Sequence, residues 1–196
     1  KLEIEGLLDQ KYKKQIPLFP MKVGIITAPT GAAVKDILST IKRRFPVCQT
    51  ILFPCLVQGE AAKDDIVKKL DIADRYNLDV IILGRGGGSI EHLWPFNEEI
   101  VARKVFDCKT PIISGVGHQI DFTICDFVAD VRAETPTGAA ERAVPKLSDV
   151  IMQIDNYKVR YTNSVKSILE NNKLKLKKLK DSYVLKNPLS LYEVKE

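Results

Sequence analysis

Short runs of apolar, mostly β-branched residues alternate with segments of helical spacing, and this alternation constrains the fold more than any other feature of the sequence. Runs without polar residues are typical of strands that are covered on both faces. The alternation therefore predicts an α/β fold with a doubly wound, mostly parallel sheet of about four or more strands and helices on both of its faces. The predicted strands cover residues 22–28, 47–53, 79–83 and 111–114, and the predicted helices cover residues 31–44, 60–76, 97–107 and 121–129.

Three loops that are rich in glycine or polar residues each follow a predicted strand. They are Thr27–Gly31, Gly84–Ser89 and Gly115–His118. In parallel sheets, ligands bind outside the carboxyl ends of the strands. We therefore expect the three loops to meet at one edge of the sheet and to form the functional site there.

The loop Gly84–Ser89, with the sequence Gly-Arg-Gly-Gly-Gly-Ser, carries the strongest chemical signal. Glycines let backbone N–H groups come close to an anion, and the guanidinium of Arg85 has donors that match phosphate oxygens. The alternative is a flexible turn without a ligand, which four glycines around one arginine disfavour. The loop has neither the Gly-Lys-Ser/Thr of a P-loop nor the spacing of a Rossmann fingerprint, so it does not specifically indicate a nucleotide.

The segment Gly117–Asp121 places a histidine and an aspartate three residues apart. The carboxylate of Asp121 can fix the tautomer of the His118 imidazole and raise its pKa, which suits a general acid or base. Equally, His118 can be structural, with Asp121 as the N-cap of the helix that follows. The spacing alone does not decide between the two.

Two further candidates are weaker. Asp36, in the second turn of the helix over 31–44, can point back toward the loops, but an ordinary exposed acid is the favoured interpretation; Thr30 is the predicted N-cap of that helix. Trp94 can stack on a base, although a lone tryptophan more often belongs to the packing.

The C-terminal part of the chain differs in charge and periodicity. Residues 1–140 carry 18 basic and 18 acidic residues, whereas residues 141–196 carry 12 and 7, which accounts for the whole net charge of +5. From Leu147 onward, apolar residues follow alternating four- and three-residue steps that slip near Asn172, and Asn187-Pro188 ends the pattern. The spacing predicts a long coiled-coil helix with a stutter, whose apolar positions need another chain or a returning helix.

Composition excludes several classes of protein. No apolar run among the 196 residues approaches the roughly 18 needed to span a membrane. The four cysteines form no Cys-x-x-Cys pair, which disfavours a zinc site and favours reduced thiols in the cytoplasm. The chain starts without Met, in residues 1–8 that suggest the end of a helix, so we expect it to be a piece of a longer protein.

Taken together, the motifs resemble the family of exodeoxyribonuclease VII large subunits. The likeness covers about residues 1–145 in order and spacing, and is looser beyond them. The motifs that carry it are Ile26–Ala33 with Asp36, Gly84–Glu91 with Leu93–Asn97, Val116–Thr123 with Asp126–Asp130, and Arg132–Glu141.

The resemblance implies a bacterial nuclease that degrades single-stranded DNA from both ends into oligonucleotides. It implies a partner as well, a small helical subunit bound in several copies along the coiled coil, and no membrane association. Residues 1–140 would be the catalytic domain and residues 141–196 a truncated coiled coil, without the family's N-terminal OB-like domain. The implied catalytic residues are Asp36, Arg85, His118 and Asp121, and the expected phosphate- or DNA-binding residues are Thr30, Gly31, Gly86, Gly87, Gly88 and Ser89.

The family does not strictly need a divalent ion, so no cofactor is required with certainty; Asp36 and Asp121 would hold Mg²⁺ if it is used. The sequence departs from the family pattern at His92 and Gln119, which stand where many relatives have acids. If those acids contribute to metal binding, a metal site is weakened here. Two other functions stay open from the residues alone. One is a phosphate-binding α/β enzyme that acts on a small nucleotide or sugar phosphate, and the other is a non-catalytic scaffold that binds single strands.

Overall fold

The structure is a computed structural model that describes residues 1–87, 90–117 and 120–186. It divides into two compact units, Lys1–Leu147 and Ser148–Glu196. The first unit therefore extends slightly beyond position 140, where we expected the α/β domain to end. All predicted site residues lie in this first unit.

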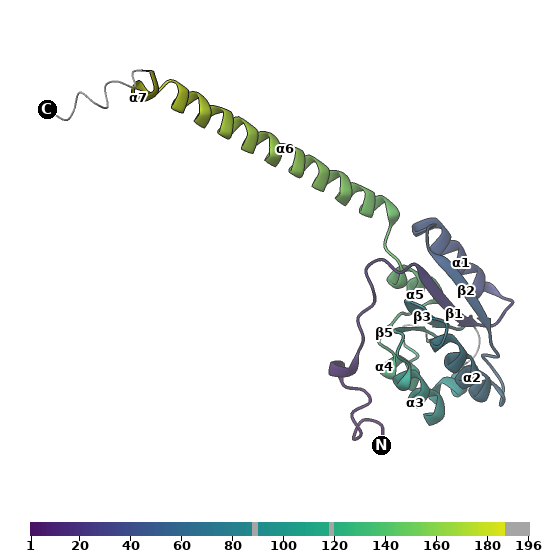
Figure 1. The fold of residues 1–196 in the computed structure, drawn as a ribbon. Coiled ribbons are helices and arrows are strands. Elements are labelled where there is room, and N and C mark those ends of the chain that lie inside the picture. Colours follow the sequence, from purple (N-terminus) through teal and green to yellow (C-terminus); the bar gives the residue numbers. More distant parts are fainter. Residues whose placement is uncertain (88–89, 118–119, 187–196) are drawn as a thin grey trace. The chain divides into compact units, whose positions relative to one another are not determined.

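The first unit is built on a five-stranded sheet in the order β2-β1-β3-β4-β5, in which every neighbouring pair is parallel. This confirms the predicted α/β class and places the first, third and fourth strands side by side at the centre (Figure 1). The strands are β1 (Lys22–Thr27), β2 (Gln49–Pro54), β3 (Val80–Gly84), β4 (Ile112–Gly115) and β5 (Val131–Arg132).

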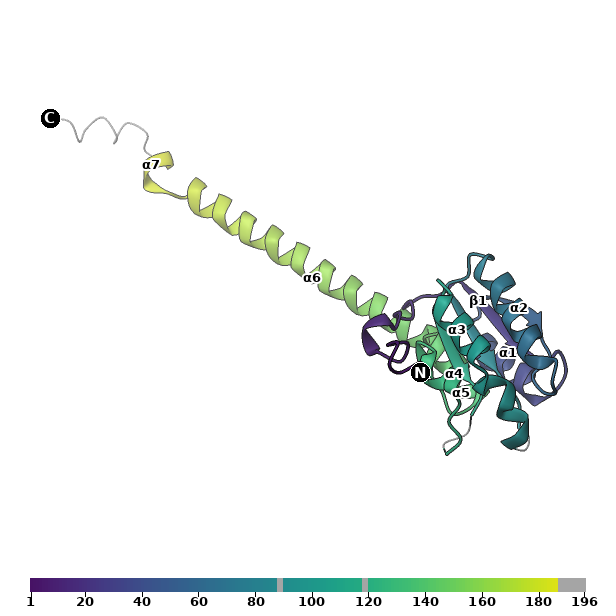
Figure 2. The ribbon, with the colours of Figure 1, turned by 90° about the horizontal axis from the view of Figure 1, so that it is seen from below.

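Helices cover both faces of the sheet, as the apolar strands require (Figure 2). Successive strand residues point to opposite faces, so Ile25 and Ile82 pack in one core, whereas Ile26 and Ile81 pack in the other. The first core includes α1 (Ala32–Arg44) and α5 (Pro136–Ala143), and the second includes α2 (Ala62–Asp74), the 3₁₀-helix η2 (Ile90–Asn97), α3 (Glu99–Asp107) and α4 (Ile124–Val128).

Several local predictions are wrong or incomplete. Residues 2–8 form turns and not the end of a helix, and Gly6 there has a φ of 78°, outside the helical region. A 3₁₀-helix, η1 (Gln10–Tyr12), follows. The strand β5 and helix α5 were not predicted; β5 has only two residues, and α5 is a short helix capped by Thr135, whose Oγ1 accepts the N–H of Gly138 at 2.9 Å.

The C-terminal unit contains the predicted long helix. This helix, α6 (Leu147–Lys180), runs unbroken through Asn172, and none of its residues is buried. It ends at Lys180, before the expected break at Asn187-Pro188, which lies outside the described residues; α7 (Tyr183–Lys186) follows. Within the described part of the chain, no helix combines the length and the apolar character needed to cross a membrane.

The last residue of α2, Asp74, connects this helix to the loop before β4. Asp74 accepts backbone N–H groups from Lys109 at 3.0 Å and from Thr110 at 2.8 Å. Burial works to raise the pKa of Asp74, but these hydrogen bonds outweigh it and hold the pKa below its ordinary value. Asp74 therefore stabilises the folded state above the unfolded-state pKa of about 4, and this contribution disappears as the pH falls through the lower folded-state pKa.

We expect Asp74→Ala to lower the free energy of unfolding by about 1–2 kcal/mol at pH 7, because two N–H groups lose a charged acceptor. The difference from wild type should shrink steadily below about pH 4. Urea unfolding at several pH values measures both effects. Asp107→Ala, at an exposed position of α3, should change stability by less than about 0.5 kcal/mol and serves as the control. A pH-independent loss in Asp74→Ala would contradict the assignment.

Candidate functional site

The three predicted loops follow β1, β3 and β4, which are adjacent parallel strands, so they meet at the carboxyl edge of the sheet as expected. The order of the strands also reverses here, because the chain passes from β1 outward to β2 and then back across β1 to β3. Such a switch point leaves a crevice between the diverging loops, and ligands of open α/β sheets bind in it.

Arg85 lies at this switch point, as the first residue after β3. Its backbone N–H donates to the carbonyl of Gly115 at 3.3 Å, which ties the start of the glycine-rich loop to the end of β4. The residue is only 5% exposed. Burial lowers the pKa of its guanidinium, and the nearby carboxylate of Asp121 acts in the opposite direction. An arginine side chain does not deprotonate in proteins, so Arg85 brings a fixed positive charge into the crevice.

Two cavities open on either side of Arg85 and share it with Gly86 and Gly87. One has a volume of about 490 Å³ and lies between the loops after β1, β2 and β3. The other, of about 250 Å³, lies between the start of α1, the glycine-rich loop and the start of α5. A substituent on Gly87 would meet no atom within 4 Å, so this backbone is open to a ligand. Gly88 and Ser89 lie outside the described residues.

The loop after β1 brings the N-terminus of α1 to the larger cavity. Thr30 is not the N-cap, as we had predicted; Gly31 occupies that position with a φ of 122°, a conformation that favours glycine. Thr30 and Gly31 both line the cavity, as does Thr27, whose buried hydroxyl oxygen has no hydrogen-bond partner among the described residues. Unpaired N–H groups and the dipole of a helix N-terminus attract anions, so this wall suits a phosphate.

The smaller cavity contains the predicted Asp36, which is exposed and lies in the second turn of α1. The same cavity is lined by Glu134, an exposed residue just before α5. Glu134 was not predicted as a site residue. No spacing in the sequence marks it, because only the packing of α5 against α1 brings it to Asp36. The cavity thus combines the cationic Arg85 with two carboxylates.

The loop after β4 is folded tightly against itself. A Cβ atom on Gly117 would lie 1.9 Å from the carbonyl oxygen of Asp121, so no other residue fits there without a shift of the backbone. Asp121 is half-buried and is not the N-cap of α4, because Thr123 caps that helix. His118 lies outside the described residues.

Asp126 holds the second half of this loop in place. This buried carboxylate accepts the hydroxyl of Ser114 at 2.6 Å, and the backbone N–H and hydroxyl of Thr123 at 2.9 Å each. Arg132 lies 4.0 Å away and rests over the ring of Phe122, 3.8 Å from its centroid. The start of α4 is therefore fixed to β4.

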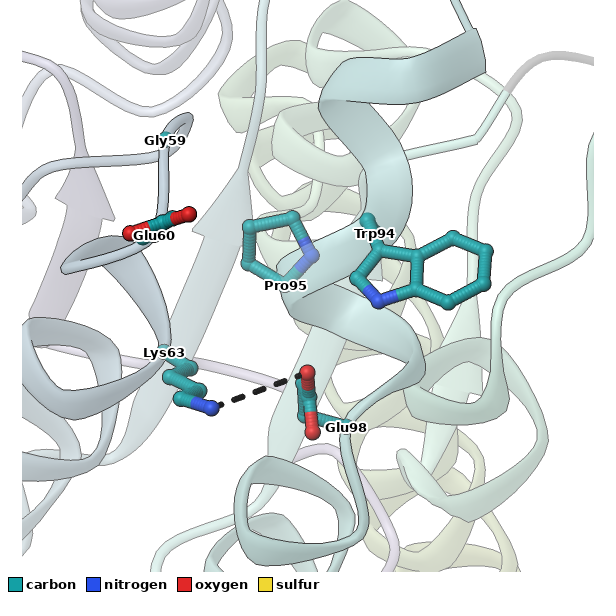
Figure 3. Close-up of a pocket in the computed structure, with 6 residues that line it drawn as sticks. All are labelled: Gly59, Glu60, Lys63, Trp94, Pro95 and Glu98. Atoms are coloured by element: carbon teal, nitrogen blue, oxygen red, sulfur yellow. Dashed lines mark ion pairs between the residues drawn. The ribbon is translucent and has the colours of Figure 1, made fainter.

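A third cavity, of about 590 Å³, lies beside these two at the same edge of the sheet. Its residues come from the start of α2 and the loop before it, from η2, and from the N-cap of α3 (Figure 3). Trp94 lies there and is 70% exposed, so our favoured interpretation of it as a packing residue is wrong. The lining residues are Gly59, Glu60, Lys63, Trp94, Pro95 and Glu98.

The described residues contain no group of three or more His, Cys, Asp or Glu side chains that could together hold a metal ion. Mg²⁺, however, is usually held by one or two carboxylates together with substrate phosphates. Asp36 lines a cavity with Arg85, and Asp121 is close enough to Arg85 for their charges to interact. The carboxylates of Asp36 and Asp121 are hard oxygen donors of the kind that such a site uses.

Comparisons with known proteins agree on one family. The family model described as exonuclease VII, large subunit, matches residues 7–196. The chain is 53% identical to the exodeoxyribonuclease 7 large subunit of Bacillus subtilis (strain 168) and 51% identical to that of Geobacillus kaustophilus (strain HTA426), over 100% of the chain and 44% of each relative. A relative of the same name in Staphylococcus aureus (strain Newman) is 51% identical over 98% of the chain. The chain thus spans less than half the length of these curated relatives.

Proposed function

The chain belongs to the exonuclease VII large-subunit family, and from this premise we propose that it forms the catalytic part of an exodeoxyribonuclease. The enzyme would hydrolyse phosphodiester bonds of single-stranded DNA from both ends and release oligonucleotides. The observation that carries the proposal is Arg85, a buried cation at the switch point of the sheet that lines two cavities at once. A phosphodiester is the anion that a guanidinium and a row of backbone N–H groups bind well.

In the proposed mechanism, Arg85 and the backbone N–H groups of residues 86–89 hold the scissile phosphate. The charge that builds up on its non-bridging oxygens in the transition state would be stabilised by these donors. A water molecule attacks the phosphorus, the bond from phosphorus to the leaving oxygen breaks, and the leaving oxygen takes up a proton.

His118 would carry out the proton transfer, either by activating the water or by protonating the leaving oxygen, and Asp121 would orient it. Asp121 is near enough to Arg85 for its charge to raise the pKa of the guanidinium, which supports placing Asp121 and Arg85 at the same phosphate. Asp36, in the cavity on the other side of Arg85, would position the water. Should Mg²⁺ take part, Asp36 and Asp121 would hold it, and the ion would neutralise charge on the phosphate.

We further propose that α6 binds the family's small subunit in several copies. Its apolar side chains are exposed at the spacing of a coiled coil; Ile151, Ile154, Val165 and Ile168, for example, are 50–60% exposed. Such a helix buries these side chains only against other helices. A cytoplasmic location is supported by four free cysteines, three of which are buried.

The proposal is tested with the full-length protein in complex with its small subunit. Single- and double-stranded DNA, labelled at either end, is incubated with the complex in Mg²⁺ and in EDTA. We expect short labelled oligonucleotides from both ends of single strands and much slower degradation of duplexes. The comparison of Mg²⁺ with EDTA decides whether the ion is needed. Binding of single strands without cleavage would favour a scaffold, and thermal stabilisation by a mononucleotide but not by oligo-dT would favour an enzyme of small phosphates.

A further inference from the structure

Trp94 stands out among the exposed aromatic residues because its surroundings are rigid. Its neighbours Leu93 and Phe96 are 4% and 0% exposed, and the side-chain oxygen of Asn97 accepts the backbone N–H of Ile124 at 2.9 Å. The helix η2 is thus anchored in the core and against α4, while the indole ring projects outward. Figure 3 shows this ring extending from η2 away from Pro95, on the side opposite Glu60.

Most of the Trp94 side chain is open to solvent, because the residue is 70% exposed. No aromatic ring or cation of the described residues rests on Trp94, whereas Phe122 is covered by Arg132 and stacks with Phe127 at 5.5 Å. Phe122 and Phe127 are half-exposed, but each ring has one face in their mutual stack, and Arg132 also lies on Phe122. Compared with Phe122 and Phe127, Trp94 is therefore the aromatic side chain whose ring is more open to a planar ligand.

The charges around Trp94 favour an uncharged ring over a phosphate. Glu60, Glu98 and Lys63 line the cavity, and Lys63 lies 3.8 Å from Glu98 in an ion pair across it. The remaining carboxylate of Glu60 repels a phosphate but can accept a hydrogen bond from the amino group of a base. These features match a nucleobase, which offers a π-face to the indole and an amino edge to an acceptor.

The cavity at Trp94 and the larger cavity at Arg85 are lined by consecutive residues of the loop after β2. Gln58 lines the latter together with Gly86 and Gly87, and the next residue, Gly59, lines the former. The Cα of Gly59 is open, with no atom within 4 Å of an added Cβ. A single strand whose phosphate is held at Arg85 can therefore follow the loop after β2 and reach the indole ring.

We propose that Trp94 and the cavity beside it form a base-stacking subsite that binds one nucleobase of the single strand at a fixed distance from the scissile phosphate. The inference rests on the proposed nuclease function. It assigns to Trp94 the role of binding the substrate away from the reacting atoms. It also gives a reason for a preference for single strands, because a base inside a duplex has no free face to stack on the indole.

The test uses the full-length protein in complex with its small subunit and oligo-dC substrates, whose bases carry an amino group, in which one abasic residue is moved along the strand. With wild type, we expect one abasic position to raise KM about tenfold, the size of one lost base–aromatic stack, with kcat within about threefold. Trp94→Ala should raise KM for the intact oligonucleotide by a similar factor and should no longer respond to the abasic residue at that position. Trp94→Phe should keep most of the affinity.

Phe19→Ala is the matched control, since Phe19 is a 53% exposed aromatic residue that precedes β1, at the opposite edge of the sheet. It should leave KM and the abasic profile unchanged. The subsite is disproved if Trp94→Ala keeps the wild-type abasic profile, whatever its overall activity. A wild-type complex that does not cleave single strands at all would instead overturn the proposed function, so the two failures are distinguishable.

Discussion

Replacing Arg85 with alanine should lower kcat/KM for single-stranded DNA by about 100- to 1000-fold in the full complex. Loss of one positioned donor to a developing oxyanion typically costs this much. Here the donor is also a buried cation in the wall between two cavities. Most of the loss should fall on kcat, because the charge of the phosphate increases in the transition state. Initial rates of oligonucleotide release measure the effect.

Arg85→Lys should recover only a small part of the activity, because an ammonium group is a point charge and cannot bind two phosphate oxygens in the fork geometry. Arg75→Ala is the control. Arg75 caps the far end of α2, where it pairs with Asp71 at 2.6 Å on the surface, and its loss should change kcat/KM by less than about twofold. An Arg85→Ala complex that keeps more than about a third of the wild-type activity and its normal melting temperature would contradict the assignment.

Replacing Gly117 with alanine, which adds one methyl group, should have the second-largest effect on activity. In Gly117→Ala, the new Cβ would fall 1.9 Å from the carbonyl oxygen of Asp121, and neither atom belongs to a flexible side chain. The loop between the two residues must therefore move, and it carries Asp121 and His118 with it. A displacement of about 1 Å at a catalytic group can cost about 100-fold in rate. We expect kcat to fall by that order and stability to fall by about 1–3 kcal/mol, as in other overpacked sites.

Gly138→Ala makes the same chemical change where the close neighbour is a side chain and not the backbone. Its Cβ would lie 3.2 Å from the hydroxyl oxygen of Thr135, a tight contact that a shift of a few tenths of an ångström in this side chain relieves, and within helix α5 alanine is a better helix former than glycine. The single-turnover rate of this variant should stay within about threefold of the wild-type rate, and its thermal melt should show little change in stability. If Gly117→Ala kept wild-type rates, the tight fold of the loop would have no part in placing the catalytic groups.

The architecture follows from the sequence because burial leaves a regular pattern in it. Strands β1 and β3, covered on both faces, need apolar side chains at nearly every position, and such runs stand out. Parallel pairing then forces the loops that follow them to one edge. By contrast, β5 has only two residues, which is too short to leave a recognisable run of apolar residues in the sequence. The positive φ of Gly31, which displaces Thr30 from the N-cap position, is likewise a property of the folded backbone.

The site was harder to predict where it depends on packing between distant elements. Glu134 is an ordinary acid in the sequence and reaches Asp36 only because α5 packs beside α1. Trp94 lies in the apolar string Leu93-Trp94-Pro95-Phe96, in which nothing local tells which side chain is left outside the core. Arg85, in contrast, was predictable, because glycines around an arginine after a buried strand have a direct physical meaning.

The central claim is that Arg85 and Asp121 act on one phosphate as a unit at the carboxyl edge of the sheet. A double-mutant cycle tests it most directly. Single-strand hydrolysis is measured for wild type, Arg85→Ala, Asp121→Ala and the double variant, each as the full complex with unchanged melting temperature. Groups that act as a unit are strongly non-additive, so we predict that the double variant is about as slow as the slower single variant. Losses that multiply would show that the two residues act independently and would contradict a single shared site.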